Sequence, residues 1–275
     1  MSLEDERIGF IGGGAMAEAL LGGLLAAGVA RERLRASDPE AARRQHLARQ
    51  LGIDAGADNA ELVRGSSVVV LAVKPGVVPA VLGALGDEAD TTRPLWISIA
   101  AGVTLASLEA GLSPEARIVR AMPNTPALVQ TGATGLCGNA RAGSGELALA
   151  TALFDGVGIT WQAPREPLLD AVTGLSGSGP AYVFLFLEAL IDAGVGQGLP
   201  REAAERLAFQ TVYGAAKLAR GSQRSPAELR RQVSSPGGTT LAGLARLEAT
   251  GFAEAIGEAV GAATRRAGEL GRGEP

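Results

Sequence analysis

The chain has 275 residues, of which 47 % are hydrophobic and 20 % are charged, and its formal net charge is −4. This length can bury a large core and accommodate two domains, and the composition is typical of a soluble globular protein. The mild acidity and the lack of a basic block argue against a nucleic-acid or anionic-membrane partner.

The chain has one cysteine, Cys137, and one histidine, His46. A single cysteine excludes an intrachain disulfide and favours a reducing compartment, so we expect a cytoplasmic protein. Cys137 lies in a predicted strand and is interpreted as a buried structural thiol. His46 follows two arginines on a helix that is expected to face solvent. These positions argue against Ser-His or Cys-His catalysis and against a histidine-based metal site, and no metal is expected.

The first hundred residues alternate short apolar runs with helical stretches. That alternation is typical of a parallel sheet with crossover helices. Strands are expected at Arg7–Ile11, Leu34–Ser37, Ser67–Val73 and Leu95–Ile99, helices at Ala15–Ala27 and Pro39–Leu51, and further strands at Arg117–Met122, Thr134–Leu136 and Gly158–Gln162.

Beyond about residue 165 the apolar residues recur at helical spacing only. The sequence therefore predicts an α/β Rossmann-type nucleotide-binding domain over residues 1–165 and an all-α domain over residues 166–275. The apolar positions that follow Leu168 are too many for a monomer surface, which favours an oligomer interface. Ala181–Leu187 is too short an apolar run to span a bilayer. Helices are expected at Leu168–Val195, Arg201–Ala219, Pro226–Gln232, Gly238–Ala249 and Phe252–Glu269.

A glycine-rich turn follows the first predicted strand. Residues 12–17 read Gly-Gly-Gly-Ala-Met-Ala, a Gly-x-Gly-x-x-Ala pattern between an apolar strand and a helix. In a dinucleotide-binding fold, Gly12 permits the tight turn, Gly14 lets the backbone approach a pyrophosphate, and Ala17 lets the helix pack closely on the strand. The pattern predicts a dinucleotide site, and the alternative is a packing turn without a ligand.

The end of the second predicted strand bears on the choice between NADH and NADPH. Asp38 stands where an acidic residue binds the ribose hydroxyls of NAD. Asp38-Pro39 is also a good helix start, with Asp38 as the N-cap. In that case Ser37 meets the ribose or its 2′-phosphate, assisted by Arg43 or Arg44. The preference between the two cofactors stays open.

Other segments follow predicted strand ends, where doubly wound sheets bind their ligands. Ala72–Pro75 contains Lys74, which either serves an anionic group or is a plain surface lysine. Ala100–Gly102 and Met122–Pro126 can wall the nicotinamide pocket. Asn59 ends a short loop and either caps the next helix or faces the adenosine.

Two glycine-rich motifs lie in the C-terminal half. Leu175–Pro180 places glycines inside a predicted helix, which a close ligand and a packed second helix explain equally well. Ser234–Thr240 reads Ser-Ser-Pro-Gly-Gly-Thr-Thr and places two glycines and four hydroxyls at the mouth of a predicted helix. Such a helix start presents free amides and the positive end of the dipole to a small anion.

The motifs occur in the order IGFIGGGAMAEAL, LAVKP, RAMPNTPALV, GLSGSGPAYVF and VSSPGGTT. Together they closely resemble the pyrroline-5-carboxylate reductase family over nearly the whole chain. The resemblance implies a C-terminal helical dimerisation domain and a homodimer that assembles into a larger ring. It also implies reduction of 1-pyrroline-5-carboxylate to L-proline, the final step of proline biosynthesis, with NADPH as the expected cofactor and NADH as the alternative.

The resemblance also assigns residues. The chain departs from the common pattern at Ala15, where relatives often have Asn, and one pyrophosphate contact is expected to change. The expected catalytic residue is Thr240, and the expected substrate contacts are Ser235, Gly238, Thr239 and Thr240. The expected cofactor contacts are Gly12, Gly13, Gly14, Ala15, Met16, Ala17, Ser37, Asn59, Ala72, Val73, Lys74, Pro75, Ala100, Ala101, Gly102, Glu166 and Gln232.

Reduction of a cyclic imine needs a hydride at carbon and a proton at nitrogen, and no histidine or metal. The Thr240 hydroxyl either relays that proton or only positions the ring. One alternative is a two-domain hydroxy-acid dehydrogenase, which would need a lysine or histidine base and has only Lys217 in the C-terminal half. The other is a non-catalytic NADPH sensor, which would not need an anion loop.

Overall fold

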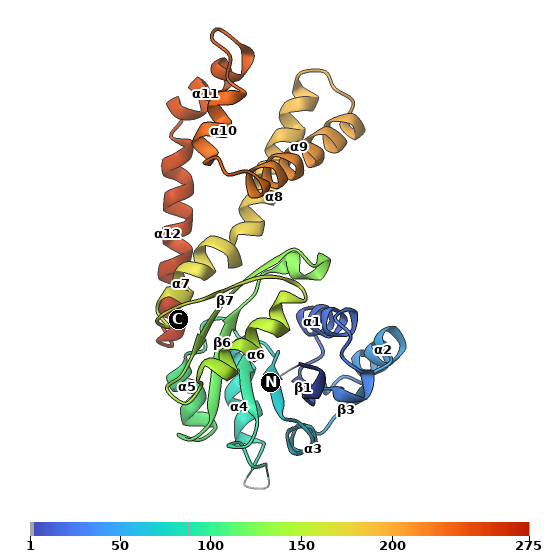
Figure 1. The fold of residues 1–275 in the computed structure, drawn as a ribbon. Helices are drawn as coiled ribbons and strands as arrows, with labels where there is room; N and C mark the ends of the chain where they lie inside the picture. The colour runs from blue at the N-terminus through green and yellow to red at the C-terminus, as the bar shows by residue number, and fades with distance from the viewer. Residues whose placement is uncertain (1–2, 87–88, 275) are drawn as a thin grey trace. The chain divides into compact units, whose positions relative to one another are not determined.

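The computed structural model describes residues 3–86 and 89–274, which form two compact units. The first unit extends to Ser178 and includes the chain again from Gly261, and the second is Gly179–Val260. Figure 1 shows the sheet of the first unit and the helices of the second. Helix α7 (Leu168–Val172), which the sequence assigns to the C-terminal domain, buries its Leu169 in the core of the first unit.

The first unit is built on one eight-stranded sheet in the order β3-β2-β1-β4-β5-β6-β7-β8. Every adjacent pair is parallel except β6 and β7, which are antiparallel. The strand order reverses at β1, and doubly wound sheets bind their ligands at such a reversal. The strands are β1 (Ile8–Ile11), β2 (Leu34–Ser37), β3 (Asp54–Gly56), β4 (Val68–Leu71), β5 (Leu95–Ser98), β6 (Arg117–Met122), β7 (Gly132–Gly138) and β8 (Gly158–Gln162).

Helices cover both faces of this sheet. Alternate residues of a strand point to opposite faces, so Phe10 lies in one buried cluster and Ile11 in the other. The first cluster takes side chains from α1 (Ala15–Ala26), α2 (Ala41–Leu51) and α6 (Ser144–Asp155). The second takes side chains from α3 (Asn59–Gly65), α4 (Val78–Gly83), α5 (Leu105–Gly111) and α7. This is the predicted doubly wound α/β arrangement.

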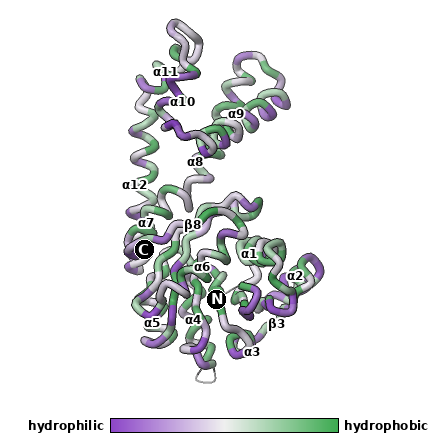
Figure 2. The backbone as a smooth tube through the Cα atoms, in the orientation of Figure 1, coloured by the Kyte–Doolittle hydropathy of each residue, from purple (hydrophilic) through white to green (hydrophobic). Residues whose placement is uncertain are grey.

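Helices α1 and α2 show how burial follows composition. Helix α1 buries Leu20, Leu21 and Leu24 and is coloured as hydrophobic in Figure 2. Helix α2 buries only Leu47 and is coloured largely as hydrophilic. The prediction that α2 starts at Pro39 with Asp38 as its N-cap is wrong, because the N-cap is Glu40.

The predicted helix Leu168–Val195 is interrupted. After α7 the chain makes a π-helical turn, Thr173–Gly177, before α8 (Gly179–Gly196) begins. The hydroxyl of Thr173 donates to the carbonyl of Leu169 at 2.8 Å. A Cβ on Gly177 would lie 2.6 Å from the Met122 side chain, so glycine allows close packing at this position.

The second unit has few buried side chains. Its core cluster consists of Ile191, Ala204 and Ala208 between α8 and α9 (Arg201–Gly221). By length and composition alone, Leu168–Gly196 could also cross a membrane. The remaining helices are α10 (Pro226–Gln232), α11 (Thr239–Ala249) and α12 (Phe252–Gly271). Large apolar side chains are exposed at Val183, Phe184, Leu185, Leu207, Phe209, Tyr213 and Leu218.

Candidate active site

The glycine-rich turn lies where the strand order reverses. Gly12 has φ +95°, and its amide donates to the carbonyl of Ser37 at 2.8 Å. A Cβ on Gly12 would lie 2.7 Å from the carbonyl oxygen of Ala72, so only glycine fits this turn. Gly14 is the N-cap of α1, and no other atom lies within 4 Å of a Cβ built on it. The backbone at Gly14 therefore leaves room for the close approach that a bound pyrophosphate requires.

The Gly13 peptide is held on both sides by charged groups. Its amide donates to Asp38 Oδ2 at 2.8 Å, and its carbonyl accepts from Arg43 Nε. Arg43 also pairs with Glu18, which lies 3.0 Å from His46 Nε2. Burial alone would raise the pKa of the Glu18 carboxyl, but hydrogen bonds from His46 and Arg43 outweigh it and hold that pKa below its ordinary value.

Two predicted cofactor contacts, Ser37 at the end of β2 and Asn59 at the start of α3, touch each other. The Ser37 hydroxyl, only 1 % exposed as a residue, donates to Asn59 Oδ1 at 2.6 Å. Asn59 is the first residue of α3 and is not its cap. The cap is Asp58, whose carboxylate accepts from the amide of Glu61 at 3.0 Å. The capping alternative for Asn59 is therefore wrong.

The ends of β4 and β5 lie at the same edge of the sheet as the glycine turn. The amide of Ala72 donates to the carbonyl of Ile11 at 2.8 Å, and Lys74 is exposed just beyond. Ala100 is buried, and Gly102 has φ +75°. The structure therefore gathers Gly12–Ala17, Ser37, Asn59, Ala72–Pro75 and Ala100–Gly102 at one sheet edge.

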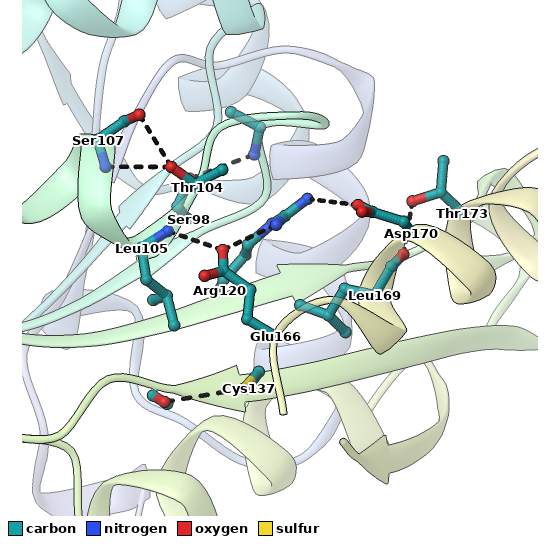
Figure 3. A network of polar contacts seen from close by, with 12 residues as sticks. Ser98, Thr104, Leu105, Ser107, Arg120, Cys137, Glu166, Leu169, Asp170 and Thr173 are labelled. Atoms are coloured by element: carbon teal, nitrogen blue, oxygen red, sulfur yellow. Dashed lines mark hydrogen bonds and ion pairs between the residues drawn. The ribbon is translucent and has the colours of Figure 1, made fainter. Parts of the chain in front are cut away.

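An ion-pair cluster that sequence reasoning missed lies behind the β5–α5 loop (Figure 3). Arg120, on β6, is only 4 % exposed. Its guanidinium lies 2.8 Å from Glu166 Oε1 and 3.6 Å from Asp170 Oδ1. The same Glu166 oxygen accepts from the amide of Leu105 at 2.8 Å. Glu166 was predicted as a cofactor contact, and here its carboxylate is engaged by two protein donors.

Cys137 lies beside this cluster, opposite Arg120 in the β6–β7 ladder. Burial raises the pKa of the Cys137 thiol, and the negative charge of Glu166 raises it further against the opposing effect of Arg120. A thiol kept protonated in this way is a poor nucleophile, which agrees with the structural role expected from the sequence.

The second glycine-rich motif lies in the second unit and is described by itself. Gly237 has φ +70°, and Gly238 is the N-cap of α11. A Cβ on Gly238 would lie 2.5 Å from the hydroxyl oxygen of Ser235, so glycine brings the loop close to the helix start. Thr239 and Thr240 open the helix, where amides have no partner within the helix. Gln232, the last residue of α10, is exposed.

The chain is similar to known proteins over nearly its full length. The family model for pyrroline-5-carboxylate reductase dimerisation matches residues 166–270, and the model for NADP oxidoreductase, coenzyme F420-dependent, matches residues 7–102. The pyrroline-5-carboxylate reductase of Synechocystis is 49 % identical, over 97 % of this chain and 98 % of the relative. That of Pseudomonas aeruginosa is 48 % identical, over 98 % of each.

Solved structures agree. A pyrroline-5-carboxylate reductase from Coxiella burnetii superposes with a TM-score of 0.91 at 40 % identity, covering 96 % of this chain and 98 % of that one. The Plasmodium falciparum pyrroline carboxylate reductase, solved with NADP bound, gives a TM-score of 0.87 at 34 % identity, covering 98 % and 100 %.

Proposed function

Because this chain belongs to the pyrroline-5-carboxylate reductase family, we propose that it reduces 1-pyrroline-5-carboxylate to L-proline, the final step of proline biosynthesis. The observation that carries the proposal is the helix start at Gly238, which provides an anion site in addition to the nucleotide turn. A non-catalytic nucleotide sensor would have no use for this second site. Against a hydroxy-acid dehydrogenase, the Lys217 ammonium lies over the Tyr213 ring, 5.7 Å from its centroid.

The nucleotide turn fits a dinucleotide for two reasons. A side chain at Gly12 would collide with the carbonyl of Ala72, so the tight turn needs glycine there, and the space beside Gly14 is open to a pyrophosphate. NADPH is the proposed cofactor, in line with the NADP bound to the Plasmodium relative. When bound, the reduced nicotinamide supplies the hydride. The proposed cofactor contacts are Gly12–Ala17, Ser37, Asn59, Ala72–Pro75, Ala100–Gly102, Glu166 and Gln232.

The loop before α11 provides the substrate contacts. The amides of Thr239 and Thr240 at the helix start bind the substrate carboxylate, assisted by Ser235. Gly238, whose own amide donates to the carbonyl of Ser235 at 3.0 Å, holds the loop beside them and contacts the substrate through its backbone. The Thr240 hydroxyl hydrogen-bonds the ring nitrogen and relays a proton to it from water. Because a threonine hydroxyl is a weak acid, positioning contributes more than proton donation.

The helical unit serves dimerisation. Its exposed apolar side chains, with Leu185 at 66 % and Phe184 at 60 %, form a face that a second copy covers, which explains the apolar stretch Leu168–Gly196 without a bilayer. We expect these dimers to assemble into a larger ring and the enzyme to work in the cytoplasm. The border between residues 165 and 166 is proposed as the start of the dimerisation module, whose family model begins at 166.

One assay tests the activity directly. Purified protein with 1-pyrroline-5-carboxylate and NADPH should oxidise the cofactor, measured by the loss of nicotinamide absorbance. A protein that turns over with neither NADPH nor NADH would overturn the proposal.

Thr240→Ala should lower kcat/KM about tenfold, because it removes one transition-state hydrogen bond worth roughly 1.4 kcal/mol. The matched control is Thr250→Ala, at the C-cap of α11, whose hydroxyl donates only to backbone carbonyls of its own helix. Steady-state kinetics should show an unchanged Thr250 variant. Equal kinetics for both variants would remove Thr240 from the mechanism.

A further inference from the structure

Resting on the proposed function, we propose that Arg120 and Glu166 are positioning residues that fix the β5–α5 loop, residues 99–104, as the wall of the nicotinamide pocket. For Arg120 this role needs no contact with the dinucleotide, and for Glu166 it is separate from the cofactor contact proposed above. Both act through the amide of Leu105, which ends the loop and begins α5.

The first step concerns the shared carboxylate. Glu166 Oε1 accepts from the Leu105 amide and from Arg120 Nη1, each at 2.8 Å (Figure 3). The guanidinium side chain is 5 % exposed and the Glu166 side chain 24 %. A charge-assisted hydrogen bond in this setting is stronger and more directional than one in water. The start of α5 is therefore fixed to strand β6.

The second step concerns what this anchor holds. The loop between β5 and α5 contains Ala100–Gly102, which lies at the sheet edge that carries the glycine turn. Within the strand before it, Ser98 lies opposite Arg120 in the ladder, and its hydroxyl accepts from the Ala100 amide at 3.4 Å. Both ends of the loop are thus tied to the strands beneath it.

The third step concerns the packing of α12 on the same loop. A Cβ on Gly102 would lie 3.0 Å from Leu270, and one on Gly271 would lie 3.3 Å from Thr104. The last turn of α12 therefore packs against the loop. With Glu166 holding its end and α12 packed against it, the loop has little freedom to move away from a bound nicotinamide.

Binding of NADPH to the full-length protein, measured by isothermal titration calorimetry, tests the proposal. Glu166→Ala should raise Kd about tenfold, because it removes the acceptor for the Leu105 amide. Glu166→Gln keeps an acceptor oxygen and should stay within about threefold of the unsubstituted protein. A purely structural role would not produce this difference at equal thermal stability.

A matched control is Glu146, on α6, whose ion-pair partner lies on the same strand as Arg120. Glu146 pairs with Arg117 at 3.1 Å, at the amino end of β6 and away from the loop. Glu146→Ala should lower Tm and leave Kd unchanged within about twofold. If Glu166→Ala and Glu166→Gln weaken binding equally, or if Glu166→Ala binds as Glu146→Ala does, the inference is overturned.

A second pair keeps the test decisive if Glu166→Ala does not fold. Leu105 is the first residue of α5, where proline is tolerated, and Thr104 before it has φ −79° and ψ 158°, which suit a following proline. Leu105→Pro removes the N–H donor, whereas Leu105→Ala keeps it. Only the proline variant should raise Kd about tenfold, and equal values would contradict the proposed anchor.

Calorimetry needs no turnover, so the two proposals fail separately. A protein with this pattern of Kd values that does not reduce 1-pyrroline-5-carboxylate would overturn the reaction and support the positioning role. An active protein whose Kd ignores these substitutions would do the reverse.

Discussion

At the scale of single residues, we expect the preference between NADH and NADPH to depend on Asp38. Its carboxylate receives the Gly13 amide, and the nearby cations are already engaged, Arg43 by Glu18 and Arg44 by backbone carbonyls. A 2′-phosphate would meet this carboxylate without a free guanidinium to offset it. Asp38→Ser should therefore shift the kcat/KM ratio toward NADPH over NADH by about tenfold, or roughly 1.4 kcal/mol. Loss of the hydrogen bond from the Gly13 amide should weaken the binding of NADH and NADPH equally. The kcat/KM ratio therefore reports only the effect of the 2′-phosphate. Asp58→Ser, which keeps a capping hydroxyl on α3, should leave the ratio unchanged. An unchanged ratio in Asp38→Ser would show that Asp38 does not face the ribose.

At the scale of elements, the β1–α1 turn separates folding from binding. Gly12→Ala forces a side chain into the carbonyl of Ala72 at φ +95°, so it should destabilise the protein by about 1–3 kcal/mol and lower Tm. At Gly14 the φ angle is −63° and the space around a Cβ is open, so Gly14→Ala should leave Tm unchanged. Its methyl group should nevertheless block the approach of a pyrophosphate. Thermal melting and calorimetric titration with NADPH distinguish the two. Normal binding by Gly14→Ala would contradict the assignment of this turn to the pyrophosphate.

The elements also show which parts of the fold and of the site could be predicted from the sequence. Strands β1, β2, β6 and β8 follow from local apolar runs, whereas the short β3 was missed because Asp54–Gly56 lacks such a run and forms only by pairing with β2. The capping role expected of Asp38 was wrong because α2 starts later, with Glu40 as its N-cap, and the two Asp38 oxygens accept from the amides of Gly13 and Glu40 instead. Arg120 gave no signal because its partner Glu166 lies 46 residues away in sequence. Strands with local apolar runs can thus be predicted from the sequence, whereas ion pairs between residues far apart in the chain cannot.

For the whole molecule, assembly rests on the apolar face of the helical unit. Leu185→Glu places a charge on that face and should convert dimers to monomers, because burying an unpaired carboxylate costs several kcal/mol, on the order of the gain from apolar contacts. Leu185→Met keeps the face apolar and should stay dimeric. Light scattering coupled to size-exclusion chromatography measures the mass directly. A dimeric Leu185→Glu variant would place the interface elsewhere.

Helix α12 begins in the second compact unit and ends in the first, where its final turn rests on the loop at Gly102. The nucleotide-binding unit is therefore not continuous along the chain. During synthesis on the ribosome, the β5–α5 loop emerges long before the turn that covers it, so this unit cannot be completed until α12 has been made. A nascent chain that stalls before α12 should hold a formed sheet and an unfinished cofactor pocket, which ties the onset of dinucleotide binding to the synthesis of α12.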